Sequence, residues 1–130
     1  TRTNPSYIQY KANMNRPRIF FNKLFGNFIS LLWPRNKTLL SDVGCTYRAF
    51  WRTKYDKIKK NLISDSAAFA PELTIECINN GFRVIEIPVN YYPRNMGVSK
   101  FSGTYIKSGV TALKMLKIIL QKRFLYLFKK

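Results

Sequence analysis

The sequence predicts an α/β fold in which part of the sheet is missing. Apolar residues recur at helical spacing in four segments, while two shorter segments alternate or are rich in β-branched residues, as strands are. The resulting order is helix, strand, helix, helix, strand, helix. With 46% apolar residues the chain can bury a core. Two strands are too few for a complete sheet, so we interpret the 130 residues as one small domain or a piece of a larger one.

The first predicted helix begins at Pro17, because proline fits the first turn of a helix, where its missing N–H is not needed. It ends before Pro34. Its apolar residues are spaced three or four apart, namely Phe20, Phe21, Leu24, Phe25, Phe28, Ile29 and Leu32. This spacing is typical of an amphipathic helix.

The first predicted strand covers residues 43–50, where four apolar or small residues alternate with Gly44, Thr46, Arg48 and Phe50. We expect Thr53 to cap the short helix that follows. The apolar side of that helix would carry Tyr55, Ile58 and Leu62.

The second half of the chain is predicted to contain a helix, a strand, a loop and a final helix. A helix is expected to start at Pro71, and the residues Asn79-Asn80-Gly81 are a signal for its C-cap. Residues 82–89 form the clearest predicted strand, and residues 91–103 a loop. The last helix, residues 104–130, has one apolar stripe, formed by Ile106, Val110, Leu113, Leu116, Leu120, Phe124 and Leu127.

Charge narrows the choice of partner. Lys and Arg number 23 against six acidic residues, a net charge of +17, which favours nucleic acid, phosphorylated ligands or an anionic membrane surface. The sequence has no histidine, which excludes histidine-based triads and histidine metal sites. Cys45 and Cys77 have no metal-type spacing and are interpreted as buried free thiols in a reducing compartment. We expect neither a membrane-spanning helix nor a signal peptide within these residues.

Three stretches carry candidate chemistry: Asp42 before Gly44, Glu72 after Pro71, and a loop with Arg94, Ser99 and Lys100. Each also has a purely structural interpretation. Asp42 can cap a turn, an acid such as Glu72 favours the first turn of any helix, and the loop cations can be solvated.

Taken together and in this order, the stretches resemble family 2 glycosyltransferases, and above all the dolichol- and polyprenyl-phosphate sugar transferases, such as dolichol-phosphate mannosyltransferases. The resemblance rests on Asp-Val-Gly-Cys-Thr-Tyr-Arg-Ala-Phe at 42–50, the Glu72 helix, Gly-Phe-Arg-Val-Ile-Glu-Ile-Pro-Val at 81–89, and Arg94 with Gly-Val-Ser-Lys at 97–100. The start of the chain is also similar to the segment after the metal site in that group, through Thr1-Arg2 and through Arg16 or Arg18 entering a helix with Asn22.

The resemblance implies a GT-A fold, in which a Rossmann-like amino-terminal half binds the nucleotide and an Asp-x-Asp motif holds Mg²⁺ or Mn²⁺. None of the six acidic residues here has that spacing: Asp42, Asp56, Asp65, Glu72, Glu76 and Glu86. We therefore expect residues 1–103 to be the carboxyl-terminal half of a GT-A domain, inactive alone and without a metal site of its own. We expect residues 104–130 to be an amphipathic helix at the membrane interface, with a core helix packed on the missing half as the alternative.

For function, the resemblance implies inverting transfer of a sugar from a nucleotide donor to a polyprenyl or dolichyl phosphate, at the cytoplasmic face of a membrane, in cell-wall or glycan biosynthesis. Arg94, Ser99 and Lys100 would bind phosphate, with Arg2 and Arg18 as weaker candidates for the same role. A lipid phosphate is already an anionic nucleophile, whereas a sugar hydroxyl needs a catalytic base, for which Asp42 or Glu72 is the choice.

Three alternatives stay open. The first is a family 2 transferase that elongates a cell-surface glycan. The second is a basic nucleic-acid-binding module, which the charge and the 15% aromatic share would suit; its aromatic residues, however, fall on faces that need a core, so no nucleic-acid partner is expected. The third is a non-catalytic membrane scaffold.

Overall fold

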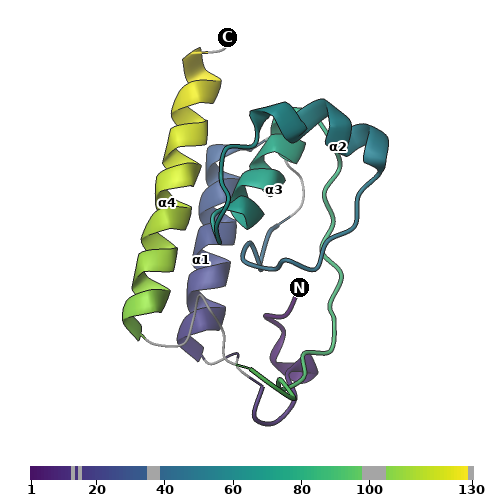
Figure 1. Ribbon diagram of the computed structural model, residues 1–130, viewed down its shortest axis with the longest axis vertical. Helices are drawn as coiled ribbons and strands as arrows, with labels where there is room; N and C mark the ends of the chain where they lie inside the picture. Colours follow the sequence, from purple (N-terminus) through teal and green to yellow (C-terminus); the bar gives the residue numbers. More distant parts are fainter. Residues whose placement is uncertain (13, 15, 35–38, 98–104, 129–130) are drawn as a thin grey trace.

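The computed structural model describes residues 1–12, 14, 16–34, 39–97 and 105–128. The helices in this part of the chain are η1 Pro5–Tyr7, α1 Arg16–Leu32, α2 Arg52–Ile58, η2 Lys59–Asn61, α3 Phe69–Asn79 and α4 Tyr105–Phe128. Helices α1 and α4 run side by side, and the extended segment that follows α3 descends on the opposite side of the molecule (Figure 1). Residues 98–104 and 129–130, which belong to the predicted last loop and last helix, lie outside the described residues.

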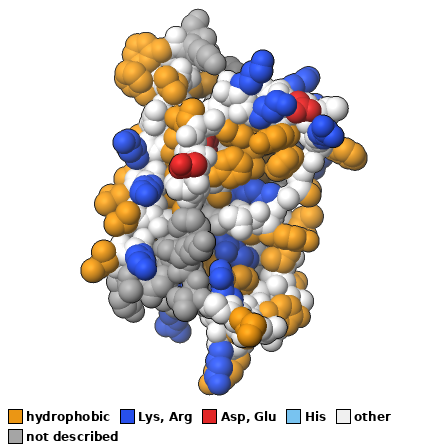
Figure 2. Space-filling model, viewed as in Figure 1, with side chains coloured by type: hydrophobic (Ala, Val, Ile, Leu, Met, Phe, Trp, Pro, Cys, Tyr) orange, Lys and Arg blue, Asp and Glu red, His pale blue; other side chains and the backbone are white. Residues whose placement is uncertain are grey.

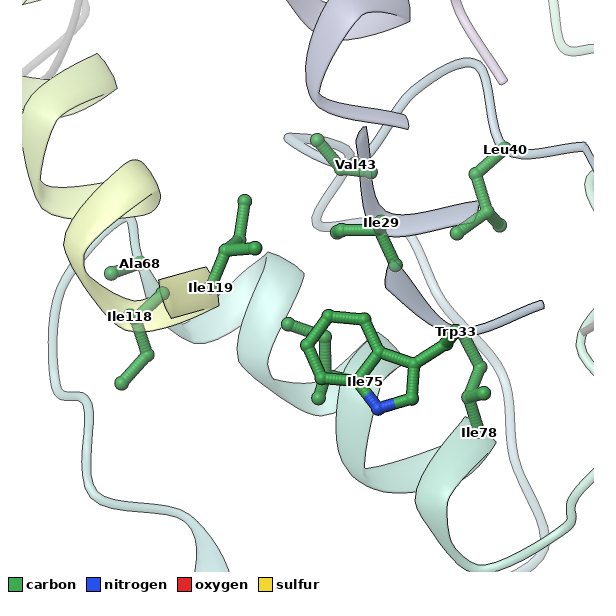
Figure 3. Packing of buried hydrophobic residues seen from close by; sticks show 9 residues of the cluster. All are labelled: Ile29, Trp33, Leu40, Val43, Ala68, Ile75, Ile78, Ile118 and Ile119. Atoms are coloured by element: carbon green, nitrogen blue, oxygen red, sulfur yellow. The ribbon is translucent and has the colours of Figure 1, made fainter. Parts of the chain in front are cut away.

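The core forms where three helices meet: α1 and α4 each contribute a narrow buried stripe, and α3 is buried over most of its length. Its members are Ile29 and Trp33 from α1 and its end, Ile75 and Ile78 from α3, Ile118 and Ile119 from α4, and Leu40, Val43 and Ala68 from the connections (Figure 3). The indole N–H of Trp33 donates a hydrogen bond of 2.6 Å to Asn79 Oδ1. This bond satisfies the single polar group of a side chain that is otherwise packed among isoleucines.

The helices agree with the sequence predictions, apart from one cap. Gly81 has a φ of +69° and ends α3: its N–H donates to Ile78 O at 3.0 Å, and the next N–H, of Phe82, donates to Cys77 O at 2.9 Å. These two bonds are those of a Schellman motif, so the predicted C-cap is confirmed. The predicted cap of α2 is wrong, because Trp51 rather than Thr53 occupies the N-cap position and no side chain caps the helix.

The two predicted strands, residues 43–50 and 82–89, do not form in the part of the chain that the structure describes. The first begins in a turn, in which the Cys45 N–H donates to Asp42 O at 3.2 Å. The second is extended, and Thr1 pairs with its end: the Thr1 amino group donates to Ile87 O, and the Val89 N–H donates to Thr1 O at 3.1 Å. Just beyond it the described residues form one isolated parallel bridge, between Ile8 and Tyr91, so that these contacts do not extend into a ladder. A strand needs a neighbouring backbone along its length, which a pattern of side chains does not supply. The partial GT-A fold therefore stays a prediction, as does the division at residue 103.

Helix α4 packs on α1 and α3 through a face that the predicted stripe does not include. Ile118, Ile119 and Lys122 are the buried residues of this helix. The stripe is mainly on the outer side, where Ile106 is 81% exposed, Leu113 67% and Phe124 61%. None of the described helices is both long and apolar enough to cross a membrane.

Candidate active site

A cleft of about 860 Å³ opens between the loop that leads into α2, one side of α3, and the extended residues 82–89. Its polar lining includes Asp42, Arg48 and Glu86. Aromatic side chains of Tyr47, Phe50 and Trp51 also line it. The cleft is therefore the place where the chain brings charged groups from distant segments together.

Asp42 lies at this cleft with a fully buried carboxylate that Arg2 holds on both oxygens. Arg2 donates from its backbone N–H to Asp42 Oδ2 at 2.7 Å, from Nε to Oδ2 at 2.9 Å and from Nη2 to Oδ1 at 2.8 Å. The two residues are 40 positions apart, so only the fold brings them together. Bidentate arginine–carboxylate pairs of this kind are strong and fix the orientation of both groups.

The charge state of Arg2 follows from this pair. Burial alone lowers the pKa of Arg2, but the hydrogen bonds and the negative charge of Asp42 outweigh burial, and the pKa is raised above its ordinary value. Arg2 is thus a permanent cation, and its guanidinium also lies 5.5 Å from the centre of the Tyr91 ring. Two of the residues selected from the sequence therefore form one unit.

Glu86 reaches the same place from the extended segment, although the sequence analysis did not select it. Its carboxylate accepts hydrogen bonds from the backbone N–H groups of Ser41 and Asp42, with N–O distances from 2.9 to 3.0 Å, and from Ser41 Oγ at 2.6 Å. The available signal was its position, since it is the single acid in the extended residues 82–89.

Helix α1 is tied to the same loop through Asn22. The Gly44 N–H donates to Asn22 Oδ1 at 3.1 Å, and Asn22 Nδ2 donates to Arg18 O at 2.9 Å. A Cβ atom on Gly44 would lie 2.7 Å from Asn22 Oδ1, so the loop approaches the helix as closely as glycine permits. Arg18 lies in the first turn of α1, and Asn22 connects its carbonyl group to the loop that follows Asp42.

Arg48 fastens the loop to α3. It donates from Nε to Cys45 O at 2.7 Å, from Nη2 to Val43 O at 3.0 Å and from Nη1 to Thr74 Oγ1. Burial lowers the pKa of Arg48 from its ordinary value. Because these partners are carbonyl and hydroxyl groups, Arg48 holds the backbone that carries Asp42 against α3.

Glu72, the other candidate base, is elsewhere. Its carboxylate is fully buried, accepts the N–H groups of Ile63 at 2.9 Å and Ser64 at 2.8 Å, and lies 2.8 Å from Lys122 Nζ. Burial raises the pKa of Glu72, but the hydrogen bonds from Lys122 and the two N–H groups outweigh burial and lower it. Lys122 Nζ also lies 2.9 Å from Glu76 Oε1. Glu72 does not line the cleft with Asp42, and we interpret it as a structural residue.

Of the remaining phosphate candidates, the structure describes Arg94. Arg94 is exposed in the segment after Tyr91, and it is not among the residues that line the cleft. Ser99 and Lys100 lie outside the described residues.

The described residues do not form a place for a metal ion, since they contain no group of three or more His, Cys, Asp or Glu side chains that could hold one. Cys45 and Cys77 are free and both line the cleft. The described residues therefore do not fit the Mg²⁺ or Mn²⁺ that the resemblance implies.

The carboxylate of the Arg2–Asp42 ion pair lines the cleft, whereas Arg2, with a side chain 20% exposed, is not among the lining residues. A fixed cation next to a cleft, in a strongly basic chain, fits a protein that handles anionic substrates. Comparison with known proteins makes the class more specific. Over 72 residues, 55% of this chain, the sequence is 38% identical to the polyprenol monophosphomannose synthase of Mycolicibacterium smegmatis. The match spans 27% of the length of that protein, about a quarter. No family model matches the chain, and no solved structure matches it. Over the matched residues the chain is thus related to a glycosyltransferase.

Proposed function

We propose that this chain is part of an inverting family 2 glycosyltransferase that moves a sugar from a nucleotide donor to a polyprenyl or dolichyl phosphate. The observation that carries the proposal is the match to a polyprenol monophosphomannose synthase. The Arg2–Asp42 pair supports it, because Asp42 lines the cleft and fixes the orientation of a neighbouring cation that can bind a phosphate.

In the proposed reaction, an oxygen of the lipid phosphate attacks the anomeric carbon of the donor sugar. A carbon–oxygen bond to the acceptor forms as the bond to the diphosphate breaks, and the nucleoside diphosphate leaves with the bonding electrons. The acceptor is already an anion, so no base is needed. Asp42 then has the task of orienting Arg2, whose side chain is 20% exposed and keeps N–H donors beyond the two that contact Asp42.

Arg2 is the cation that we assign to the acceptor phosphate, and Arg94 with Ser99 and Lys100 to the donor diphosphate. Arg18 would assist from the first turn of α1. Cations at these places stabilise the negative charge that develops on the leaving diphosphate. If the acceptor is instead a sugar hydroxyl, as in elongation of a glycan, Asp42 would accept its proton.

We expect that, in the full-length protein in membranes with Mn²⁺ and labelled nucleotide sugars, label enters the fraction extracted by organic solvent. Arg94→Ala and Lys100→Ala should each lower this transfer about 100-fold or more, the loss typical when a donor to the developing negative charge is removed. Lys60→Ala removes an exposed cation of η2 and serves as the matched control, expected to transfer at the wild-type rate.

The location of the label decides between the alternatives. Label found only in aqueous or polymeric glycan would show that the lipid acceptor is wrong while keeping the enzyme class. The absence of transfer and of nucleotide-sugar binding would contradict the enzyme and favour the nucleic-acid or scaffold alternatives. Those two differ in turn, since binding to nucleic acid weakens steeply with salt.

A membrane surface is the second proposed partner, at the cytoplasmic face. Neither α1 nor α4 contains an acidic residue. In α1, Phe20, Phe21, Leu24 and Leu31 are between 46% and 75% exposed, and α4 adds the exposed stripe described above. Figure 2 shows apolar side chains along the α4 side of the molecule with Lys and Arg among them. An apolar face flanked by cations suits the headgroup region of an anionic leaflet.

Vesicle sedimentation tests this surface. We expect binding to vesicles with anionic phospholipid and much weaker binding to neutral vesicles, because both charge and apolar area contribute. Phe124→Ser on the stripe should weaken binding about 10-fold or more, since burial of such a side chain is favourable by about 1.5–3 kcal/mol. Ile63→Ser, which changes an apolar residue 58% exposed outside both helices, is the matched control. Equal binding by both variants would contradict a lipid-facing stripe.

A further inference from the structure

Glu86, unlike the buried Glu72, makes its contacts with backbone N–H groups at the cleft. Its two oxygens accept the N–H groups of two successive residues, Ser41 at 2.9 and 3.0 Å and Asp42 at 3.0 Å, together with Ser41 Oγ at 2.6 Å. The contact joins residues 44 and 45 positions apart, so it connects the extended segment directly to the loop that carries Asp42.

The N–H groups of Ser41 and Asp42 depend on Glu86 for a hydrogen-bond acceptor. Residues 41 and 42 lie outside any described helix or ladder, and Glu86 is the acceptor that the structure shows for both N–H groups. A half-buried N–H without an acceptor is costly, and a charged acceptor binds about twice as strongly as a neutral one. The Glu86 carboxylate therefore supplies the acceptors that backbone carbonyls supply in a sheet, and it fixes the position of the Asp42 backbone.

The same carboxylate also reaches the segment that carries Arg2. Ser41 Oγ, which donates to Glu86, accepts a hydrogen bond from Thr3 Oγ1 at 3.1 Å and lies 2.8 Å from Thr1 Oγ1. Thr1 and Thr3 flank Arg2 in the sequence. Hydrogen bonds through Ser41 thus connect Glu86 to both the loop of Asp42 and the segment of Arg2. The Arg2–Asp42 ion pair joins the same two segments directly.

We propose that Glu86 is the positioning residue of the Arg2–Asp42 pair, and so of the cation that receives the acceptor phosphate; this inference rests on the proposed function. In this role Glu86 acts through the Ser41 and Asp42 backbone, to which its carboxylate oxygens are bonded. Its effect is on the geometry of the pair, because a catalytic group displaced by about 1 Å can lose about 100-fold in rate.

The test uses the full-length protein in membranes and the variant Glu86→Gln, which keeps the shape of the side chain but replaces one acceptor oxygen by an N–H₂ donor. That donor would face the N–H or O–H groups of Ser41 and Asp42, so the loop has to shift. We expect kcat for sugar transfer to fall about 10- to 100-fold, while KM for the nucleotide sugar changes less than about 3-fold. Asp65→Asn removes an exposed acid far from these contacts in the sequence and should leave both constants unchanged.

Two further measurements keep the result decisive. Amide hydrogen exchange should become about 10-fold faster or more at residues 41 and 42 in Glu86→Gln, with the core helices unaffected, since only the local acceptor is lost. Ser41→Ala deletes the 2.6 Å contact without changing any charge, and is expected to lower kcat about 3- to 10-fold even if Glu86→Gln fails to fold.

The outcomes separate the two proposals. An active wild type whose kcat is unchanged by both Glu86→Gln and Ser41→Ala overturns the positioning role. If the wild type transfers no sugar, the proposed function fails, yet the exchange experiment still decides on Glu86. Faster exchange confined to residues 41 and 42 then supports its hold on the loop, and unchanged exchange refutes it.

Discussion

The free energy of unfolding of a Lys122→Met variant is expected to be about 3–5 kcal/mol lower than that of the wild type at pH 7. Lys122 is 4% exposed and contacts two buried carboxylates, Glu72 at 2.8 Å and Glu76 at 2.9 Å, and it also donates to Asn61 O. Methionine fills similar volume but leaves both carboxylates inside the protein without their cation. Removal of one partner from a buried ion cluster costs much more than the loss of an exposed pair.

The lowered pKa of Glu72 predicts how the stability of the wild type and of Lys122→Met changes with pH. The pKa of Glu72 is lowered in the folded chain, so Glu72 stabilises the fold fully above its ordinary pKa of 4.5 and loses that contribution as the pH falls through the folded value. The wild type should therefore lose stability below about pH 5. In Lys122→Met the deficit should shrink on acidification, because protonation removes the uncompensated negative charge.

Urea unfolding at pH 7 and pH 4 checks both statements. The fluorescence of Trp33, which is 3% exposed, reports on the core when the exposed Trp51 is replaced by phenylalanine in every variant. Lys117→Met, an exposed position on the same helix, is the control and should change stability by less than about 0.5 kcal/mol. Adding Glu72→Gln to Lys122→Met should recover part of the loss. A deficit in Lys122→Met below about 1 kcal/mol at pH 7 would contradict the buried cluster.

The second large effect is expected for Gly26→Ala, which should destabilise by about 3 kcal/mol or more. A Cβ atom at Gly26 would lie 2.1 Å from Leu40 O and 2.6 Å from Leu40 C, and it would meet the Ser41 N at 3.2 Å. These are backbone atoms, so no side-chain rotation can relieve the clash, and α1 must separate from the segment that leads to Asp42.

Gly109→Ala provides a control of opposite sign. Gly109 is an exposed glycine of α4 with no atom within 4 Å of the added Cβ, so alanine should stabilise that helix by about 1 kcal/mol. Thermal unfolding of the two variants side by side measures both. A Gly26→Ala variant as stable as the wild type would mean that α1 does not rest directly on the backbone of residues 40 and 41.

Sequence patterns were sufficient for the helices because a helix satisfies its own hydrogen bonds locally. The apolar spacing after Pro17 led to α1, and Asn79-Asn80-Gly81 marked the end of α3 where Gly81 adopts a positive φ. The strand predictions failed for the opposite reason. Residues 82–89 have the composition of a strand and are extended, yet a ladder requires a second backbone along their length. The described residues supply Thr1 at the end of the segment and one bridge beyond it, at Tyr91.

The candidate site divides in the same way. The sequence by itself determined a basic chain with a helical framework and, through resemblance, selected Asp42 and Arg2 as candidate site residues. Only the tertiary structure decided that these two form one unit, that Glu72 is instead buried against Lys122, and that Glu86 holds the loop of Asp42. These contacts join residues 40, 50 and 44 positions apart. An ion pair depends on the distance and burial of its members, and no local spacing in a sequence contains either quantity.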